Sequence, residues 1–304
     1  MIVTTRFPDL PPGPETAANA EFRARFRAGW GRVESVFLAR SARVEAGPLP
    51  SAWSIKLALE GTAELQLGRR RLRLEPGRFL LVNPGHAYRV RIDQPALCFS
   101  LHLGPALVRE VAASQGLGWD AALDGADPAR PEPLWREQLQ RDDDAALRPW
   151  LARIRARVTG AAAGAHEEDF VELLACLLAR ECRERQRSLA RLSAQRAVTR
   201  DELLRRLGWA SDFIESHYRE PIGLAQMAAA AHLSKFHFLR AFRELHGRTP
   251  ADHLRARRAE AVRRARAAGV RDVDALLAAS GFGSRWSLQR ALRDHGATHL
   301  PATP

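Results

Sequence analysis

Two segments of the chain, 223–247 and 272–296, carry basic, amide and large apolar side chains at matching positions. Arginine bonds both O6 and N7 of guanine, and glutamine bonds adenine in a comparable way, so these residue types suit the recognition of DNA bases. The residues that we expect to face double-stranded DNA are Lys235, Phe236, Leu239, Arg240 and Arg243 in the first segment and Arg285, Trp286, Gln289, Arg290 and Arg293 in the second.

The expected contacts differ in kind. Base readout is assigned to one set of side chains: Arg240, Arg285, Gln289 and Arg290. Arg243 and Arg293 suit phosphates, which position a protein on the duplex without reading its sequence. Trp286 suits a thymine methyl group or a sugar. Phe236 has a competing interpretation as a core residue.

Each segment has the pattern of a helix, a turn and a second helix. Apolar residues recur where the two helices must share a buried face, pairing Met227 with Leu276, Leu233 with Phe282, Phe238 with Leu288 and Phe242 with Leu292. Ser234 and Ser284 occupy the position before each second helix, where a serine side chain caps the free backbone N–H groups. The repeat predicts two helix–turn–helix motifs, because an internal repeat reflects one structural unit used twice.

A helix from about Pro250 to Ala268 is expected to connect the two motifs. Thr249 and Pro250 suit its start, and Gly269 suits its end. At 1.5 Å per residue this helix is about 28 Å long. It can therefore hold two recognition helices roughly one duplex turn, about 34 Å, apart on one face of DNA.

Residues from about Leu207 to Gly296 resemble the DNA-binding domain of AraC/XylS-type transcription regulators. The resemblance is carried by SKFHFLRAFR at Ser234–Arg243, GRTP at Gly247–Pro250, GF at Gly281–Phe282 and LQRALR at Leu288–Arg293. It implies a sequence-specific transcription regulator that binds DNA, forms a homodimer and has RNA polymerase as a further partner. The second motif departs from the family in Trp286, where a small polar residue is usual, and in Leu292, where phenylalanine is expected.

Short β-like runs punctuated by Gly and Pro fill the region from Val33 to Leu103 and predict an antiparallel barrel or sandwich. The stretch Leu72–Val90 resembles the cupin-like barrel that precedes this DNA-binding domain in many family members. The resemblance implies a small-molecule effector, and the candidate pocket residues are Trp53, His86, Tyr88 and His102. The region contains no His-x-His pattern, so we expect no metal and no cofactor.

From Gly104 to about Arg187 the pattern becomes helical. One apolar stripe at helical spacing is typical either of a core or of a dimer seam, and it consists of Phe170, Leu173, Leu174, Leu177 and Leu178.

The predicted fold class is α+β and multidomain. It combines an N-terminal antiparallel, cupin-like β-barrel with helices and an all-α C-terminal domain with two helix–turn–helix motifs. The expected divisions are an N-terminal arm over 1–28, a cupin-like sensing domain with a helical dimerisation segment over 29–187, a linker over 188–199 and a DNA-binding domain over 200–304.

Composition narrows the possibilities further. The 304 residues carry a net charge of +12, which suits a polyanionic partner, although 45 of the 47 basic residues are arginines and such a bias can also reflect a GC-rich genome. The 3 cysteines lack metal-site spacing and suit free thiols in a reducing cytoplasm. The sequence shows neither the apolar run of about 20 residues that a membrane span needs nor a secretory signal pattern.

Two other classes of function remain open. One is a cupin-type enzyme with an accessory helical domain, and the missing metal-ligand cluster argues against it. The other is an interaction protein with a degenerate DNA-binding domain, for which the irregular second motif is the support.

Overall fold

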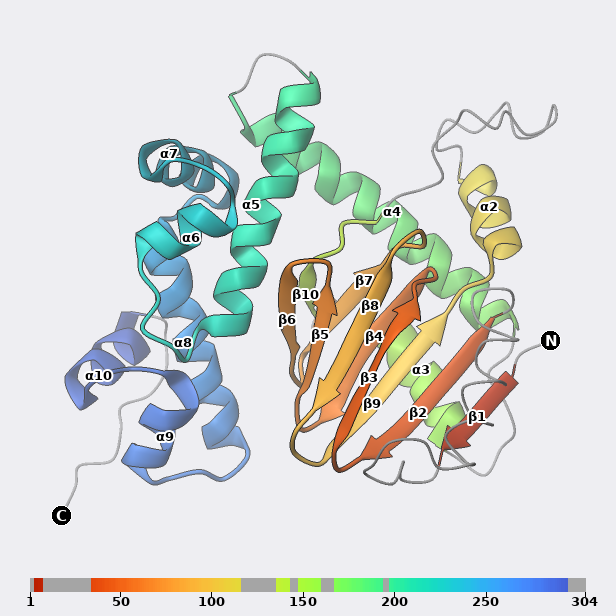
Figure 1. Ribbon diagram of the computed structural model, residues 1–304, viewed down its shortest axis with the longest axis horizontal. Helices are drawn as coiled ribbons and strands as arrows, with labels where there is room; N and C mark the ends of the chain where they lie inside the picture. Colours follow the sequence, from red (N-terminus) through yellow and green to blue (C-terminus); the bar gives the residue numbers. More distant parts are fainter. Residues whose placement is uncertain are drawn as a thin grey trace. The chain divides into compact units, whose positions relative to one another are not determined.

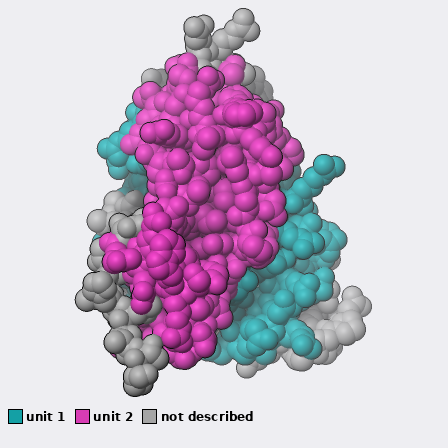
Figure 2. Space-filling view, turned by 90° about the vertical axis from the view of Figure 1, so that its left-hand side faces the viewer, with its two compact units in different colours: residues 1–187 teal, residues 188–304 magenta. Residues whose placement is uncertain are grey.

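The computed structural model describes residues 3–7, 34–115, 135–142, 147–159, 167–193 and 197–294 (Figure 1). The chain divides into two compact units, Met1–Arg187 and Ser188–Pro304, which are coloured separately in Figure 2.

The first unit contains two β-sheets. The larger has the strand order β1-β2-β9-β4-β7-β10, with β1 Val3–Phe7, β2 Ser35–Ser41, β9 Ala96–His102, β4 Ser54–Glu60, β7 Arg78–Val82 and β10 Leu139–Arg141. The smaller has the order β3-β8-β5-β6, with β3 Val44–Pro50, β8 Ala87–Ile92, β5 Ala63–Leu67 and β6 Arg70–Leu74. All pairs are antiparallel except β1 with β2. Among the described residues no ladder joins the two sheets. The α+β multidomain class is therefore confirmed, but the closed barrel is replaced by two sheets.

Alternation along the strands gives the larger sheet two buried faces. Ile55 and Leu57 of β4 belong to the core shared with the helices α2 (Pro105–Ser114), α3 (Arg148–Thr159) and α4 (Glu167–Arg191). Ala58 of the same strand belongs to a second core, which also contains Leu65 of β5 and Tyr88 of β8. Because successive side chains of a strand point to opposite faces, the even-numbered residues of β4 lie toward the smaller sheet.

Three strands differ from the sequence prediction. The sequence predicts a break at Gly47–Pro48, but β3 continues through this pair with a register shift between Ala46 and Leu49. Glycine is needed there, since Gly47 has φ +129° and a Cβ atom would lie 2.8 Å from the carbonyl oxygen of Tyr88. Part of the predicted N-terminal arm forms β1, and the rest of the arm lies outside the described residues. The segment 116–148 is loop-rich in composition and predicts a surface connection, but β10 lies within it.

The apolar stripe of α4 lies in the core of the first unit. Phe170, Leu173, Leu174 and Leu177 have no exposed surface, and Leu178 is 5% exposed. A side chain that is already covered within its own chain cannot contact a second chain. The burial of these five residues therefore supports the core interpretation of the stripe, which packs against the larger sheet.

The second unit is helical, as predicted. Its helices are α5 Ala197–His217, α6 Leu224–Ala230, α7 Lys235–His246, α8 Pro250–Ala267, α9 Val273–Ser280 and α10 Arg285–Asp294. Helix α4 extends to Arg191 and α5 begins at Ala197, so helices cover both ends of the segment 188–199 that was predicted to be a linker.

The predicted helix ends are confirmed. Ser234 accepts a hydrogen bond from the backbone N–H of His237, and Asp272 caps α9 in the same manner. Thr249 caps α8, which begins with Pro250. Gly247 ends α7 in the left-handed conformation at φ +67°.

Each motif packs on its own core. The first core joins α5, α6, α7 and α8 through residues such as Leu207, Met227 and Phe242. The second joins α8, α9 and α10 through residues such as Val262 and Leu288. Helix α8 contributes to both cores and connects the two motifs.

Candidate nucleic-acid interface

The outer face of α7 is exposed while its inner face is fully buried. Phe238 and Phe242 have no exposed surface, because they fill the first core. Phe236 is 89% exposed, so the structure places it outside the core. Leu239, Arg240 and Arg243 are also exposed. With Lys235 these residues form one continuous surface along the second helix of the first motif.

Helix α10 repeats this arrangement in the second motif. Leu288 and Leu292 are buried, so leucine at the second position completes the core where phenylalanine was expected. Trp286 is 63% exposed. The other four predicted contacts of this motif are exposed as well: Arg285, Gln289, Arg290 and Arg293. Both second helices therefore present every residue that was predicted to face DNA.

Ion pairs at these two helix faces are long. Arg240 lies 3.9 Å from Glu244, and Arg285 lies 3.9 Å from Asp274. Exposed pairs of this kind contribute about 0–1 kcal/mol. These two pairs therefore add little to the stability of the helix faces.

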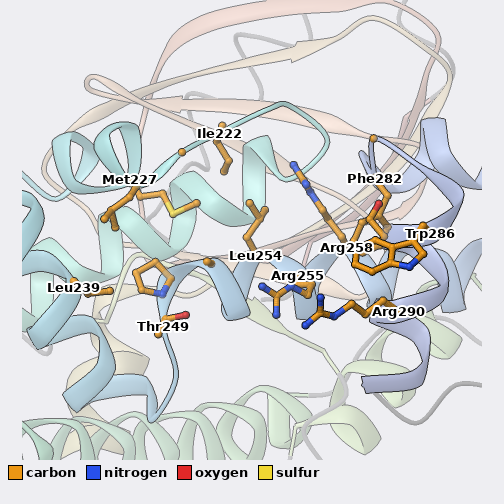
Figure 3. Close-up of a pocket in the computed structure, with 16 residues that line it drawn as sticks. Ile222, Met227, Leu239, Thr249, Leu254, Arg255, Arg258, Phe282, Trp286 and Arg290 are labelled. Carbon is orange, nitrogen blue, oxygen red and sulfur yellow. The ribbon is translucent and has the colours of Figure 1, made fainter.

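A cleft of about 710 Å³ lies between the two motifs (Figure 3). Leu239 of α7 and Trp286 and Arg290 of α10 line its sides, so the cleft separates the two exposed helices. Arg255 of α8 contributes to its floor, and in Figure 3 Arg255 and Arg290 point toward the same part of the cleft. The cleft therefore combines apolar surface with cationic groups.

Comparison with known sequences identifies both units. The family profile described as an AraC-binding-like domain matches residues 15–180, and the profile described as a helix-turn-helix domain matches residues 227–298. The chain belongs to the AraC family. It is a DNA-binding transcription regulator, as the repeated motif predicted. No curated protein sequence matches the chain.

Structure comparison finds similarity to the solved structures of two proteins, ToxT and CuxR. ToxT from Vibrio cholerae is 9% identical over 89% of this chain and 97% of its own, with a TM-score of 0.35. A structure of ToxT with bound unsaturated fatty acid is also 9% identical, over 86% and 91% of the two chains, with a TM-score of 0.33. The AraC-like transcriptional activator CuxR is 16% identical over 70% of each chain, with a TM-score of 0.29.

The four residues predicted to form an effector pocket do not converge in this AraC-family chain. Tyr88 and His102 both contact Lys56. Its Nζ is 3.4 Å from Nε2 of His102 and 4.7 Å from the centre of the Tyr88 ring. Trp53 belongs to the core on the helix side of the larger sheet. His86 instead faces Glu137, with Nε2 and Oε1 3.1 Å apart.

Lys56 is the residue that the prediction missed at this site. It lies on the inter-sheet face of β4, and burial lowers its pKa to about 7. Burial also lowers the pKa of His102 well below its usual value, raises that of Tyr88 and raises the pKa of Cys98 to about 11. The sequence signal was a lysine at an inward position of the run WSIKLAL, which is otherwise apolar apart from Ser54. The inter-sheet space therefore holds a compact group of titratable side chains.

Neither a metal site nor a membrane span is found in the part of the chain that the structure describes. No group of three or more His, Cys, Asp or Glu residues is placed to hold a metal ion there. None of the described helices is long and apolar enough to cross a membrane.

Proposed function

We propose that α7 and α10 enter successive major grooves on one face of double-stranded DNA. Base readout is assigned to Arg240 on α7 and to Arg285, Gln289 and Arg290 on α10. The single observation that supports this best is the matched exposure of both helix faces on two separately packed cores joined by one helix. Helix α8 has 18 residues and is therefore about 27 Å long, close to the span of one duplex turn.

Apolar and phosphate contacts complete the proposed interface. Phe236, Leu239 and Trp286 suit thymine methyl groups or sugars because they are large, exposed and lie beside the base-reading residues. Lys235, Arg243 and Arg293 suit phosphates, which fix the orientation of each helix in its groove.

The cleft between the motifs is assigned to the sugar–phosphate backbone. Two helices that occupy successive major grooves of one face must straddle the minor groove and the strands that border it. Those strands present apolar sugars and anionic phosphates, which match the apolar surface and Arg255 of the cleft. We assign a phosphate contact to Arg255, whose Nη1 donates a 2.9 Å hydrogen bond to Oδ1 of Asp252 and is oriented by it.

Selection of DNA fragments from a random pool tests this interface. Two preferred blocks, separated by roughly one helical turn, are expected if both motifs read bases. A single block would show that the second motif contacts only the backbone. Binding without any preferred sequence would overturn the proposal and favour the interaction-protein alternative.

Control by a small-molecule effector is proposed for the inter-sheet space of the first unit. A carboxylate or another small anion would suit Lys56, since a negative charge stabilises the protonated amine that burial disfavours. The prediction is a thermal shift on adding such an anion to the wild-type protein and no shift in Lys56→Met. A shift of equal size in both proteins would overturn this assignment.

The proposal also includes a second copy of the chain and RNA polymerase as partners. A homodimer in the cytoplasm, acting on RNA polymerase at a promoter, is the expected working form. Light scattering with and without promoter DNA tests the dimer, and transcription in a purified system tests the effect on polymerase. We propose no enzymatic activity. Metal analysis of the purified protein discriminates against the cupin-enzyme alternative, which requires a stoichiometric metal ion.

A further inference from the structure

The C-terminal end of α5 contacts α8 and the second motif. Arg258 of α8 donates from Nε to the carbonyl oxygen of Tyr218 at 2.6 Å and from Nη2 to that of Glu220 at 2.7 Å. These carbonyls belong to the turn that follows α5. The Arg258 guanidinium also lies 5.9 Å from the ring of Phe282, in the turn of the second motif. One side chain thus reaches both the turn that precedes the first motif and the turn within the second motif.

Arg219 makes a second connection between the same turn and α9. Its Nε donates to the carbonyl oxygen of Ala279 at 3.0 Å. Gly281 ends α9 in the left-handed conformation, at φ +74°. A Cβ atom on Gly281 would lie 2.4 Å from the Cα of Arg219. The two backbones therefore approach as closely as only glycine allows.

A buried ion pair anchors α8 to α5 beside these contacts. Arg257 donates from Nε to Oε2 of Glu215 at 2.6 Å, and its guanidinium lies 3.8 Å from the centre of the Tyr218 ring. The side chain of Arg257 is only 2% exposed. Salt screens such a buried pair much less than it screens the exposed pairs of α7 and α10.

The second motif is therefore attached to the first in two ways. Helix α8 connects the two motifs directly. The turn after α5 makes a second connection to the second motif through Arg219 and Arg258. The second core fixes α9 and α10 to the C-terminal half of α8, so bending or twisting of α8 is what could move one motif relative to the other. Attachment at a second point resists that movement.

We propose that Arg219 and Arg258 are positioning residues that fix the spacing and rotation between the two recognition helices, and thereby set the separation of the two DNA half-sites. This rests on the proposed function, in which both motifs read bases. Adding one base pair between half-sites moves the second by about 3.4 Å and turns it by roughly a tenth of a helical turn. A rigid pair of motifs cannot follow that displacement without losing contacts.

The test measures affinity for three DNA sites at fixed salt: the selected site and sites with one base pair added to or removed from the spacer. Wild-type protein is expected to bind the altered sites about tenfold more weakly, the equivalent of one lost base contact. Arg219→Ala is expected to bind the selected site less tightly and to reduce that tenfold preference to about threefold. Arg219 is exposed, so its replacement leaves both cores intact.

Two further variants sharpen the test. Gly281→Ala is expected to weaken the spacing preference more than Arg219→Ala does, because the added methyl group pushes α9 away from the turn. Arg263→Ala removes the same charge from an exposed position of α8 that does not line the cleft, and it should keep the wild-type preference.

The outcomes separate this proposal from the proposed function. An unchanged spacing preference in Arg219→Ala and Gly281→Ala would overturn the positioning role while leaving readout by both motifs in place. A wild-type protein that ignores spacing would also overturn it. In that case the affinity of Arg290→Ala for the selected site shows whether the second motif reads bases at all.

Discussion

Phe236 and Phe238 stand two residues apart on α7, and one is 89% exposed while the other has no exposed surface. A helix turns by roughly 100° per residue, so side chains two residues apart lie on nearly opposite sides of it. Phe238 completes the first core, whereas Phe236 projects from the surface that is assigned to DNA. The same residue type thus fills the core at one position, and we propose that it contacts DNA at the other.

Phe236 is predicted to read a thymine methyl group. Replacing that thymine by uracil removes only the methyl group, and the expected loss of affinity is about fourfold for the wild-type protein. Phe236→Ala should bind the thymine and uracil sites equally. Gel-shift titration of both proteins on both sites measures this. A wild-type protein that does not distinguish the two bases at any position of the first half-site would contradict the assignment.

Phe238→Ala is the matched control for this position. Removal of a fully buried phenylalanine is expected to lower the free energy of unfolding by about 3–5 kcal/mol, while Phe236→Ala should leave it nearly unchanged. Chemical denaturation of the two variants checks the contrast. Equal destabilisation would show that Phe236 packs on the protein.

Arg240→Ala is predicted to weaken specific binding by about 1–3 kcal/mol and to relax selection at one guanine. The physical reason is the loss of two hydrogen bonds to one base edge. Random-pool selection with the variant should show one degenerate position inside an otherwise unchanged site. Unchanged promoter affinity at fixed salt would defeat the prediction, and a uniform loss at all sequences would reassign Arg240 to a phosphate.

The local features of the second unit could be predicted from the sequence because their causes are local. Ser234, Thr249 and Asp272 cap the helices that follow them, and Gly247 and Gly281 end helices in a conformation that glycine favours. The apolar repeat then fixes which side of each helix is buried. The exposed face follows by exclusion, which is why the sequence alone predicts which residues of α7 and α10 are exposed.

Features that depend on pairing between distant segments were missed. The Gly47–Pro48 pair has the pattern of a break, and only the partner strand β8 shows that β3 passes through it as a bulge. The stripe of α4 is typical of a core or of a seam, and only the larger sheet, which is distant in sequence, shows what the stripe packs against. Arg219 and Arg258 were missed for the same reason, since carbonyl oxygens of remote segments are their partners.

Arg255→Ala is predicted to weaken binding to all DNA sequences by a similar factor. The logarithm of the association constant falls with the logarithm of the salt concentration, and the slope of this plot should be shallower by about 0.9 in the variant. The reason is that one phosphate contact releases nearly one counterion. Affinity measured over a series of salt concentrations provides the slope. Arg263→Ala should keep the wild-type slope. A changed base preference in Arg255→Ala would instead assign this residue to a base edge.

Lys56 is predicted to make the stability of the first unit depend on pH. Burial lowers its pKa from 10.5 to about 7. Between these two values the unfolded chain binds a proton that the folded chain does not bind, so stability rises with pH through this window. Below about pH 7 both states are protonated and the destabilisation is complete. Cys98 acts in the opposite direction only above its unfolded pKa of 9.0, because burial raises its folded pKa to about 11.

Lys56→Met tests this over the range from about pH 7 to pH 9, where Lys56 titrates and Cys98 does not. The variant should melt at a higher temperature than wild type near neutral pH, and its melting temperature should rise less with pH. Lys235→Met provides the control, because it removes the only other lysine, an exposed one on α7. If Lys56→Met and Lys235→Met show the same pH dependence as wild type, burial does not disfavour the charge of Lys56. That result would also overturn the proposed anion site between the sheets.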